Sequence, residues 1–217
     1  MTTPIADEVA RMHADATSRN ESDDPFTREQ AVLAAAGTPT GIASGGSTLP
    51  DAQLLDPFGN PTTLSEVLDG KAAVLVLYRG AWCPYCNLTL STYKDQLFPQ
   101  LLDQNVTLIA VSPQAPDGSL TMQEKHELPF PVLSDPGNVL ARALGVLTQP
   151  SEETLGAQRQ YGIELTEINA DGTVELPMPT VVVVDSAATV RWIDVQPDYS
   201  VRTEPDEILA AVAEVLR

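Results

Sequence analysis

Residues 72–78, AAVLVLY, form a continuous apolar run. A strand with one face in water alternates apolar and polar residues, whereas a strand covered on both faces is apolar throughout. The run therefore predicts a buried strand in a parallel or mixed sheet. Similar runs at 106–111 and 180–184 predict two more such strands. Helical patterns lie between them, so we expect an α/β fold with helices on both faces of the sheet.

The remaining elements follow from turn residues and helical spacing. Turn chemistry in DPFGN, residues 56–60, predicts a hairpin whose strands are 53–55 and 61–63. A partner strand, 188–195, is expected to follow 180–184 after a tight turn. Residues 147–175 carry a weaker pattern, in which Asp171-Gly172 predicts the turn of a second hairpin. The expected helices are 64–68, 83–101, 118–127, 138–144 and 204–216, with a short strand at 130–133.

The first fifty residues differ from the rest of the chain. Residues 4–19 and 27–36 have helical spacing, with Thr27 as a candidate N-cap and Gly37 as the stop. A stretch rich in Gly, Ser, Thr and Pro follows them, which is typical of an extended connection. We therefore expect an N-terminal helical extension and linker over 1–48 and one domain over 49–217.

Composition limits the partners. The chain has 12 Lys and Arg against 30 Asp and Glu, a formal net charge of −18. This charge argues against nucleic acid and anionic membranes, because phosphates would be repelled. The N-terminus lacks the basic and apolar pattern of a signal peptide, and no apolar stretch is long enough to span a bilayer. We expect a cytoplasmic protein, in which cysteines are kept reduced.

The two cysteines of the chain, Cys83 and Cys86, lie two residues apart. A structural zinc site usually needs four ligands, and His13 and His126 are not spaced to supply the other two. Two buried small side chains are a second interpretation, because free cysteine often packs in cores. The third, a redox couple, is favoured, because C-x-x-C near a βαβ pattern is typical of redox proteins.

The position of the pair supports redox chemistry. The strand ends near Tyr78 and the next helix begins near Cys83, which places this thiol at a helix N-terminus. Unpaired amides and the helix dipole stabilise a thiolate there. Pro84 suits the first helical position. We expect Cys83 to be the attacking and more exposed thiol, and Cys86, one turn on, to be the resolving thiol.

The segment YRGAWCPYCN, residues 78–87, resembles the active-site loop of the thioredoxin-like superfamily. More narrowly, it is similar to the AhpC/TSA, peroxiredoxin-like branch, as are FPVLSD at 130–135 and MPTVVVVD at 178–185. The resemblance implies a thioredoxin-like fold, a central mixed β-sheet flanked by helices, with the N-terminal helical extension added. It also implies a cis-proline at Pro179, with the Met178 backbone beside Cys83 to pair with an incoming peptide or thiol.

The sequence departs from the peroxiredoxin pattern P-x-x-x-T/S-x-x-C. Ending that pattern at Cys86 puts Cys83 in the Thr position and Arg79 in the Pro position, and ending it at Cys83 fits no better. The family's second Arg falls at about Pro179. Arg79 is therefore a candidate to lower the thiol pKa and orient a peroxide oxygen, or else a surface residue paired with a carboxylate.

The aromatic neighbours of the cysteines and His126 are the last residues to assign. Trp82 is expected to form a flat wall beside the thiol. Tyr85 is expected either to donate a hydrogen bond or to lie in solvent. His126 lies in a polar helical pattern and is expected to be exposed, without a role.

These expectations lead to three hypotheses. The first is an antioxidant thiol peroxidase, an oxidoreductase of cell redox homeostasis with a redox-active Cys83–Cys86 disulfide. The second is a thioredoxin- or glutaredoxin-like thiol-disulfide oxidoreductase acting on a disulfide substrate. The third is a non-catalytic redox sensor. No cofactor or metal is expected. The resemblance implies an external thiol reductant of the thioredoxin or glutaredoxin type and a homodimer.

Overall fold

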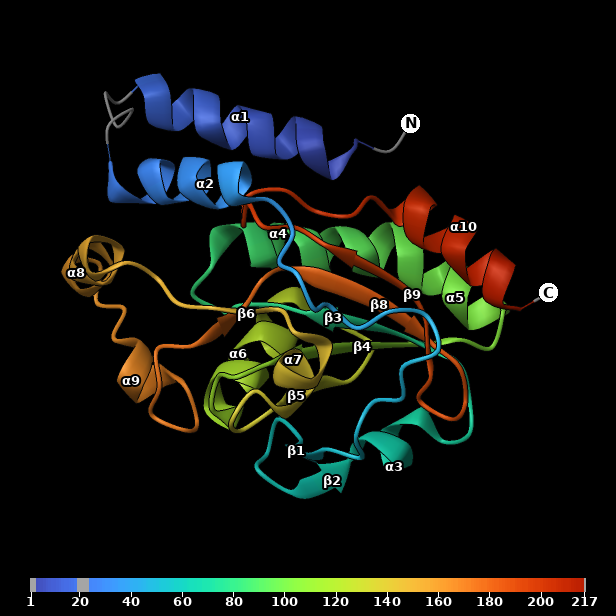
Figure 1. Ribbon diagram of the computed structural model, residues 1–217. Helices are drawn as coiled ribbons and strands as arrows, with labels where there is room; N and C mark the ends of the chain where they lie inside the picture. The colour runs from blue at the N-terminus through green and yellow to red at the C-terminus, as the bar shows by residue number, and fades with distance from the viewer. Residues whose placement is uncertain (1–2, 19–23, 217) are drawn as a thin grey trace.

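A seven-stranded mixed sheet forms the centre of the computed structural model, which describes residues 3–18 and 24–216 (Figure 1). The strand order is β2-β1-β5-β4-β3-β8-β9. β3, β4 and β5 run parallel, and the other neighbouring strands pair antiparallel. The predicted α/β fold with a central mixed sheet is confirmed. The strands of this sheet are β1 Gln53–Leu55, β2 Pro61–Thr63, β3 Ala73–Leu77, β4 Thr107–Ser112, β5 Val132–Ser134, β8 Thr180–Val184 and β9 Val190–Val195.

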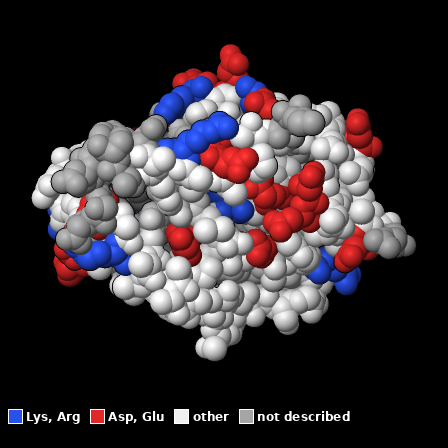
Figure 2. Space-filling view, turned by 90° about the horizontal axis from the view of Figure 1, so that it is seen from above, with Lys and Arg blue, Asp and Glu red and all other residues white. Residues whose placement is uncertain are grey.

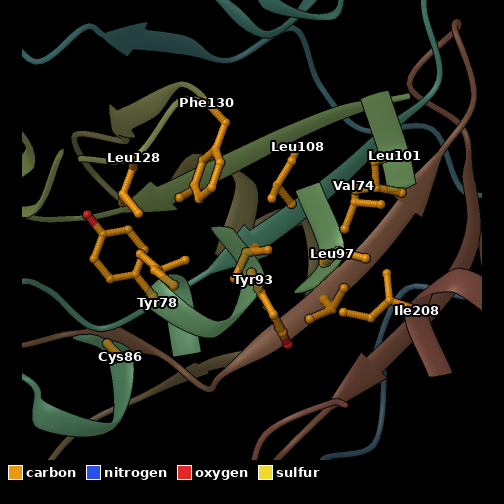
Figure 3. Close-up of a cluster of buried hydrophobic side chains, with 14 of the residues drawn as sticks. Val74, Tyr78, Cys86, Tyr93, Leu97, Leu101, Leu108, Leu128, Phe130 and Ile208 are labelled. Carbon is orange, nitrogen blue, oxygen red and sulfur yellow. The ribbon is translucent and has the colours of Figure 1, made fainter. Parts of the chain in front are cut away.

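Helices cover both faces of the sheet. They are α3 Leu64–Leu68, α4 Pro84–Thr92, α5 Phe98–Asp103, α6 Pro116–His126, α7 Val139–Leu144 and α10 Pro205–Val215. Side chains alternate along a strand, so the buried residues of β3 contribute to two cores. Val74 and Val76 pack on the side of α4 and α10, whereas Leu75 and Leu77 pack on the side of α3 and α7. Figure 3 shows the first of these cores, with Cys86 at one end of the cluster.

Two helices differ from the pattern that the sequence predicts. The predicted helix 83–101 is interrupted by a π-helical segment, Tyr93–Leu97, between α4 and α5. There the side chain of Tyr93 is buried and its hydroxyl donates to the carbonyl of Thr203. The predicted N-cap Thr27 is wrong, because the side chain of Asp24 accepts the first amides of α2, Pro25–Ala36. Gly37 ends α2 as predicted.

The segment between α7 and β8 is not a simple hairpin. Its ends pair as a two-stranded antiparallel sheet of β6, Leu147–Thr148, and β7, Leu176–Pro177. Between them lie α8, Glu152–Gln160, and α9, Leu165–Ile168. Asp171-Gly172 does form a turn, but the hairpin predicted around it is wrong, because the residues before it are helical.

The N-terminal helices lie on the side of the sheet that carries α4 (Figure 1). α1, Ile5–Ser18, packs against α4, and α2 packs against α8. The predicted helix 4–19 is thus present, although residue 19 lies outside the described residues. The carboxylate of Glu204 accepts the backbone amides of Ile5 and Ala6, which attaches the start of α1 to the start of α10.

The surface above these helices carries charges of both signs, with acidic side chains gathered near its centre (Figure 2).

None of the helices over 3–18 and 24–216 combines the length and apolar character needed to cross a membrane.

Candidate active site

The two cysteines lie where β3 gives way to α4. The chain leaves β3 at Leu77, turns at Gly80 with a φ of 146°, and enters α4 at Pro84. Cys83 is the N-cap residue of α4, so its predicted place at a helix N-terminus is found. The turn needs glycine, because a Cβ at Gly80 would lie 2.5 Å from Nε1 of Trp82.

The predicted difference in exposure between the two thiols is wrong. Cys83 and Cys86 are each only 1% exposed, and neither forms a disulfide. The pKa of Cys83 lies well above its usual value. Burial is the main cause, and the hydrogen bond with Cys86 and the charge of Cys86 add to it. The proton of the pair therefore resides on Cys83, and the premise that made Cys83 the more acidic thiol is contradicted.

Cys86 holds the negative charge. Burial opposes its ionisation, but a hydrogen bond from Cys83, the Arg202 guanidinium and the backbone amide of Arg79 outweigh burial. Together they lower the pKa of Cys86 from 9.0 to about 5. Nη2 of Arg202 lies 3.5 Å from the Cys86 sulfur. Sequence reasoning missed Arg202, which is 116 residues away in the chain.

Arg79 is not the surface residue that one interpretation predicted. It is 4% exposed, and within 3–18 and 24–216 it makes no ion pair. Its guanidinium carbon lies 4.0 Å from the ring centroid of Tyr199 and 5.1 Å from that of Trp82. Both rings are close enough for cation–π attraction. Its Nε atom is buried without a hydrogen-bond partner, so a cation with unused hydrogen-bonding capacity lies beside the thiols.

The side chain of Tyr85 is partly buried and its hydroxyl is hydrogen-bonded, so the interpretation that placed it in solvent is wrong. Its predicted role as a donor stays a prediction. Its hydroxyl lies 2.9 Å from Nε2 of His13 on α1 and accepts from Nε2 of Gln30 on α2 at 3.4 Å. The first turn of α4 is therefore tied to both N-terminal helices.

The prediction that His126 is exposed is wrong. It is partly buried, and its Nε2 lies 2.7 Å from Oδ1 of Asn87. Asn87 in turn donates to the carbonyls of Ala81 and Cys83. His126 thus supports the loop of the cysteines from α6 through one intermediate residue.

Met178 and Pro179 do not have the predicted geometry. The part of the chain that the structure describes contains no cis peptide bond, so Pro179 is trans and the cis-proline prediction is wrong. The amide of Met178 already donates to the carbonyl of Val146. Pro179 and Thr180 instead line a small hollow of about 10 Å³ beside Cys86 and Arg202. This hollow holds about one water-sized group.

A larger cavity of about 520 Å³ lies on the Cys83 side. Cys83, Arg79, Trp82 and Tyr85 belong to the loop and the first turn of α4. The other walls come from α1 and α2, from the residues after α8, and from the segment before α10. They include His13, Asp24, Phe26, Thr27, Gln30, Tyr161, Ile163 and Tyr199. We call this cavity the chamber. Cys86 does not line it, so the two sulfurs face different spaces.

The cysteine pair has no further metal-binding side chains gathered around it in the part of the chain that the structure describes. Over residues 3–18 and 24–216, no cluster of three His, Cys, Asp or Glu residues could hold one. The zinc interpretation of the cysteine pair therefore has no third ligand to support it.

Solved structures with a similar fold include proteins described as peroxiredoxins. A crystal structure described as reduced Prx3 from Vibrio vulnificus in complex with hydrogen peroxide gives a TM-score of 0.62 at 22% identity, covering 79% of this chain and 99% of the other. Peroxidoxin BcpB from Mycobacterium tuberculosis gives 0.60 at 21% identity, covering 79% of this chain and 97% of the other. At these identities the likeness establishes the thioredoxin-like fold.

Curated relatives are named in the same way. Peroxiredoxin Q, chloroplastic, from Sedum lineare is 27% identical over 57% of this chain and 68% of its own. Peroxiredoxin Bcp from Bacillus subtilis is 31% identical over 46% of this chain and 63% of its own. The matched segments thus make up about two thirds of each relative. Residues 46–193, more than half of the chain, match the AhpC/TSA family. The chain belongs to the AhpC/TSA family.

Proposed function

We propose that this protein is a thiol-dependent peroxidase that uses a Cys83–Cys86 dithiol/disulfide cycle. The observation that carries the proposal is the environment of Cys86, a buried sulfur. Against burial, a hydrogen bond from Cys83, the Arg202 guanidinium and the backbone amide of Arg79 lower its pKa to about 5. A thiolate is the nucleophile in thiol chemistry, and Cys86 is ionised at neutral pH. The peroxiredoxin relatives support peroxide as the electrophile.

The first step takes place at the Cys86 sulfur, with the reacting oxygen of the peroxide in the water-sized hollow beside it. The Cys86 thiolate attacks the terminal oxygen of a peroxide R–O–O–H, which gives a sulfenic acid and the anion RO⁻. Arg202, whose Nη2 lies 3.5 Å from the Cys86 sulfur, stabilises the negative charge that develops on the departing oxygen of RO⁻. Cys83 then gives its proton to RO⁻, which leaves as ROH. In this assignment Cys86 attacks and Cys83 is the proton donor, the reverse of the roles predicted from the sequence.

The second step closes the disulfide. The Cys83 thiolate left by the first step attacks the sulfur of the Cys86 sulfenic acid. The Cys83–Cys86 disulfide forms, and the departing hydroxide is neutralised to water by a solvent proton, which balances the proton that Cys86 released when it ionised. One dithiol and one peroxide thus give one disulfide, one alcohol or water, and one water. An external thiol must supply two electrons to restore the dithiol.

The alternative, a thiol-disulfide oxidoreductase acting on proteins, has less support. Such an enzyme needs a thiol that a folded partner can touch, and both sulfurs here are buried. The amide of Met178, which was expected to pair with an incoming chain, is already bonded. The supporting roles of Arg79, Trp82, Pro84 and Tyr85, the homodimer and the cytoplasmic location stay predictions.

The test follows the reaction of reduced protein with one equivalent of hydrogen peroxide, using Trp82 as a fluorescent reporter. The wild type should react orders of magnitude faster than a free thiol. Cys83→Ser should still react once and stop at a sulfenic acid that dimedone traps on Cys86. Cys86→Ser should lose the fast reaction. A fast Cys86→Ser protein would contradict the assigned roles, and a wild type no faster than free thiol would reject the peroxidase.

A further inference from the structure

The chamber opens onto Cys83, the sulfur that does not attack the peroxide in the proposed cycle. After peroxide has been reduced, Cys83 is half of the disulfide, and an incoming thiol must reach one of its two sulfurs. We propose that the chamber is the binding site for the reductant, a low-molecular-weight thiol that carries a carboxylate, and that it excludes protein dithiols from Cys83. The inference rests on the proposed peroxidase cycle.

The shape of the chamber supports a small molecule. Its volume of about 520 Å³ is of the size that encloses small ligands. Aromatic side chains such as Phe26, Trp82 and Tyr85 make up much of its wall. These walls would bury the carbon atoms of a small thiol. Cys83 is the one residue in the lining whose sulfur atom such a thiol can attack.

The charged residues that line the chamber are Asp24 and Arg79. The carboxylate of Asp24 is engaged at the start of α2, where it accepts the amides of Phe26 and Thr27. Arg79 is the cation that faces a ligand in the chamber. It is 4% exposed and makes no ion pair within the described ranges. Its Nε atom has no hydrogen-bond partner. Leaving a buried guanidinium without a carboxylate is costly, and a carboxylate on the ligand would remove that cost. An anionic thiol is therefore the chemical class that fits both wall and charge.

The N-terminal helices form a roof that keeps larger partners away. His13 of α1 and Gln30 of α2 both bond to the hydroxyl of Tyr85, next to the cysteines. The hydroxyl of Tyr199 donates to the carbonyl of Phe26 at 3.0 Å, and the amide of Ser151 donates to Glu29 at 2.7 Å. The roof is thus attached at the active-site helix, at the segment before α10 and at the start of α8. A folded dithiol protein cannot touch Cys83 beneath it.

The chemistry balances with two small thiols. The thiolate RS⁻ attacks the Cys83 sulfur, forms RS–S–Cys83, and expels Cys86 as its thiolate. Arg202 favours this direction, because the sulfur with the lower pKa is the better leaving group. A second RS⁻ attacks the small thiol's sulfur, which gives RSSR and Cys83 thiolate. This thiolate takes a proton from water, and the reduced pair is restored.

The experiment measures reduction alone. The disulfide form is prepared with one equivalent of peroxide, or with diamide if peroxide fails, and Trp82 fluorescence follows its reduction. The probes are 3-mercaptopropionate, 2-mercaptoethanol and cysteamine, with rates expressed per thiolate. The wild type should favour the anionic over the neutral thiol by about tenfold, and Arg79→Met should abolish that preference. Thioredoxin with its reductase should reduce the wild type more slowly than 3-mercaptopropionate does.

A filling variant tests the chamber itself. Thr27→Trp projects a ring into it from α2, and Val32→Trp, on the same helix but 68% exposed and outside the lining, is the control. Thr27→Trp should slow reduction by 3-mercaptopropionate on the order of tenfold without slowing oxidation by hydrogen peroxide. Val32→Trp should match the wild type in both steps.

Three results would overturn the proposal. The first is rapid reduction of the wild type by thioredoxin, and the second is an absence of charge preference among the small thiols. The third is a Thr27→Trp protein that slows oxidation by cumene hydroperoxide but not reduction, because the chamber would then hold the organic part of a peroxide. Failure of the peroxidase itself would appear separately, as a wild type that peroxide does not oxidise while diamide does.

Discussion

The guanidinium of Arg202 donates a hydrogen bond to the sulfur of Cys86 across 3.5 Å. The family match covers residues 46–193, and Arg202 lies beyond its end. The matched segment therefore does not include this contact. Two other bonds fix the arginine, from its Nη1 to the carbonyls of Tyr199 and Val201. A cation held this firmly favours the negative charge of the buried thiolate, together with the hydrogen bond from Cys83.

Removing that cation should raise the pKa of Cys86. The thiolate is the deprotonated form, so it exists above the pKa, which is about 5 in the wild type. In Arg202→Met we expect the midpoint of thiolate absorbance at 240 nm to move to higher pH by about 1–3 units. The rate of peroxide reduction between pH 5 and 7 should fall accordingly. Arg142→Met, which removes a surface ion pair with Glu175, should leave the titration unchanged.

The hydroxyl of Tyr93 should stabilise the fold and help to position Arg202. It donates to the carbonyl of Thr203, the residue after Arg202, at 2.7 Å in a fully buried setting. Tyr93→Phe leaves that carbonyl without its donor, so the free energy of unfolding in urea should fall by about 1–2 kcal/mol. The Cys86 midpoint should rise as well. Tyr161→Phe, at a 72% exposed tyrosine, should change the unfolding free energy by less than about 0.5 kcal/mol.

The turn before the cysteines should tolerate glycine alone. A Cβ on Gly80 would lie 2.5 Å from Nε1 of Trp82, and the φ of 146° disfavours any L side chain. Gly80→Ala should therefore cost about 2 kcal/mol or more of unfolding free energy and alter the near-ultraviolet circular dichroism of Trp82. Gly156, inside α8, has open space at its Cβ position. Gly156→Ala should stabilise the protein by about 0.5–1 kcal/mol, and an equal loss in both variants would refute the explanation.

Glu204 should control the attachment of α1. Its two carboxylate oxygens accept the amides of Ile5 and Ala6. Gln at this position keeps one acceptor and loses the charge that favours a helix N-terminus. Hydrogen exchange of the α1 amides should be about tenfold faster in Glu204→Gln than in the wild type. Glu207→Gln changes the other member of the same capping box, whose carboxylate accepts the amide of Glu204 and not an amide of the described residues of α1, and should leave the exchange of α1 unchanged.

Local patterns predicted most of the fold. The hairpin strands 53–55 and 61–63, the helix 64–68 and the strand 180–184 have the predicted bounds. Each of these elements carries its own signal, such as a turn sequence or an apolar run. The helix from Cys83 was also predicted, but not its π-helical segment, which follows from tertiary contacts such as that of Tyr93.

The electrostatics of the site could not be read from the same patterns. The helix N-terminus favours a thiolate at Cys83, yet the groups that stabilise the charge on Cys86 include an arginine 116 residues away. No local spacing marks Arg202, and none places His13 beside Tyr85, 72 residues further along. The cis peptide expected at Pro179 came from resemblance alone, and the chain departs from it.

The pairing of Leu147 with Pro177 joins the two ends of the segment that holds α8 and α9. Its helices can therefore change in length or sequence while the strands on either side keep their register. The same holds for α1 and α2, which precede the first strand. Relatives with the same sulfur chemistry can thus acquire different specificities for small molecules through changes in these peripheral segments. A comparison of the sheet sequences alone would not reveal that difference.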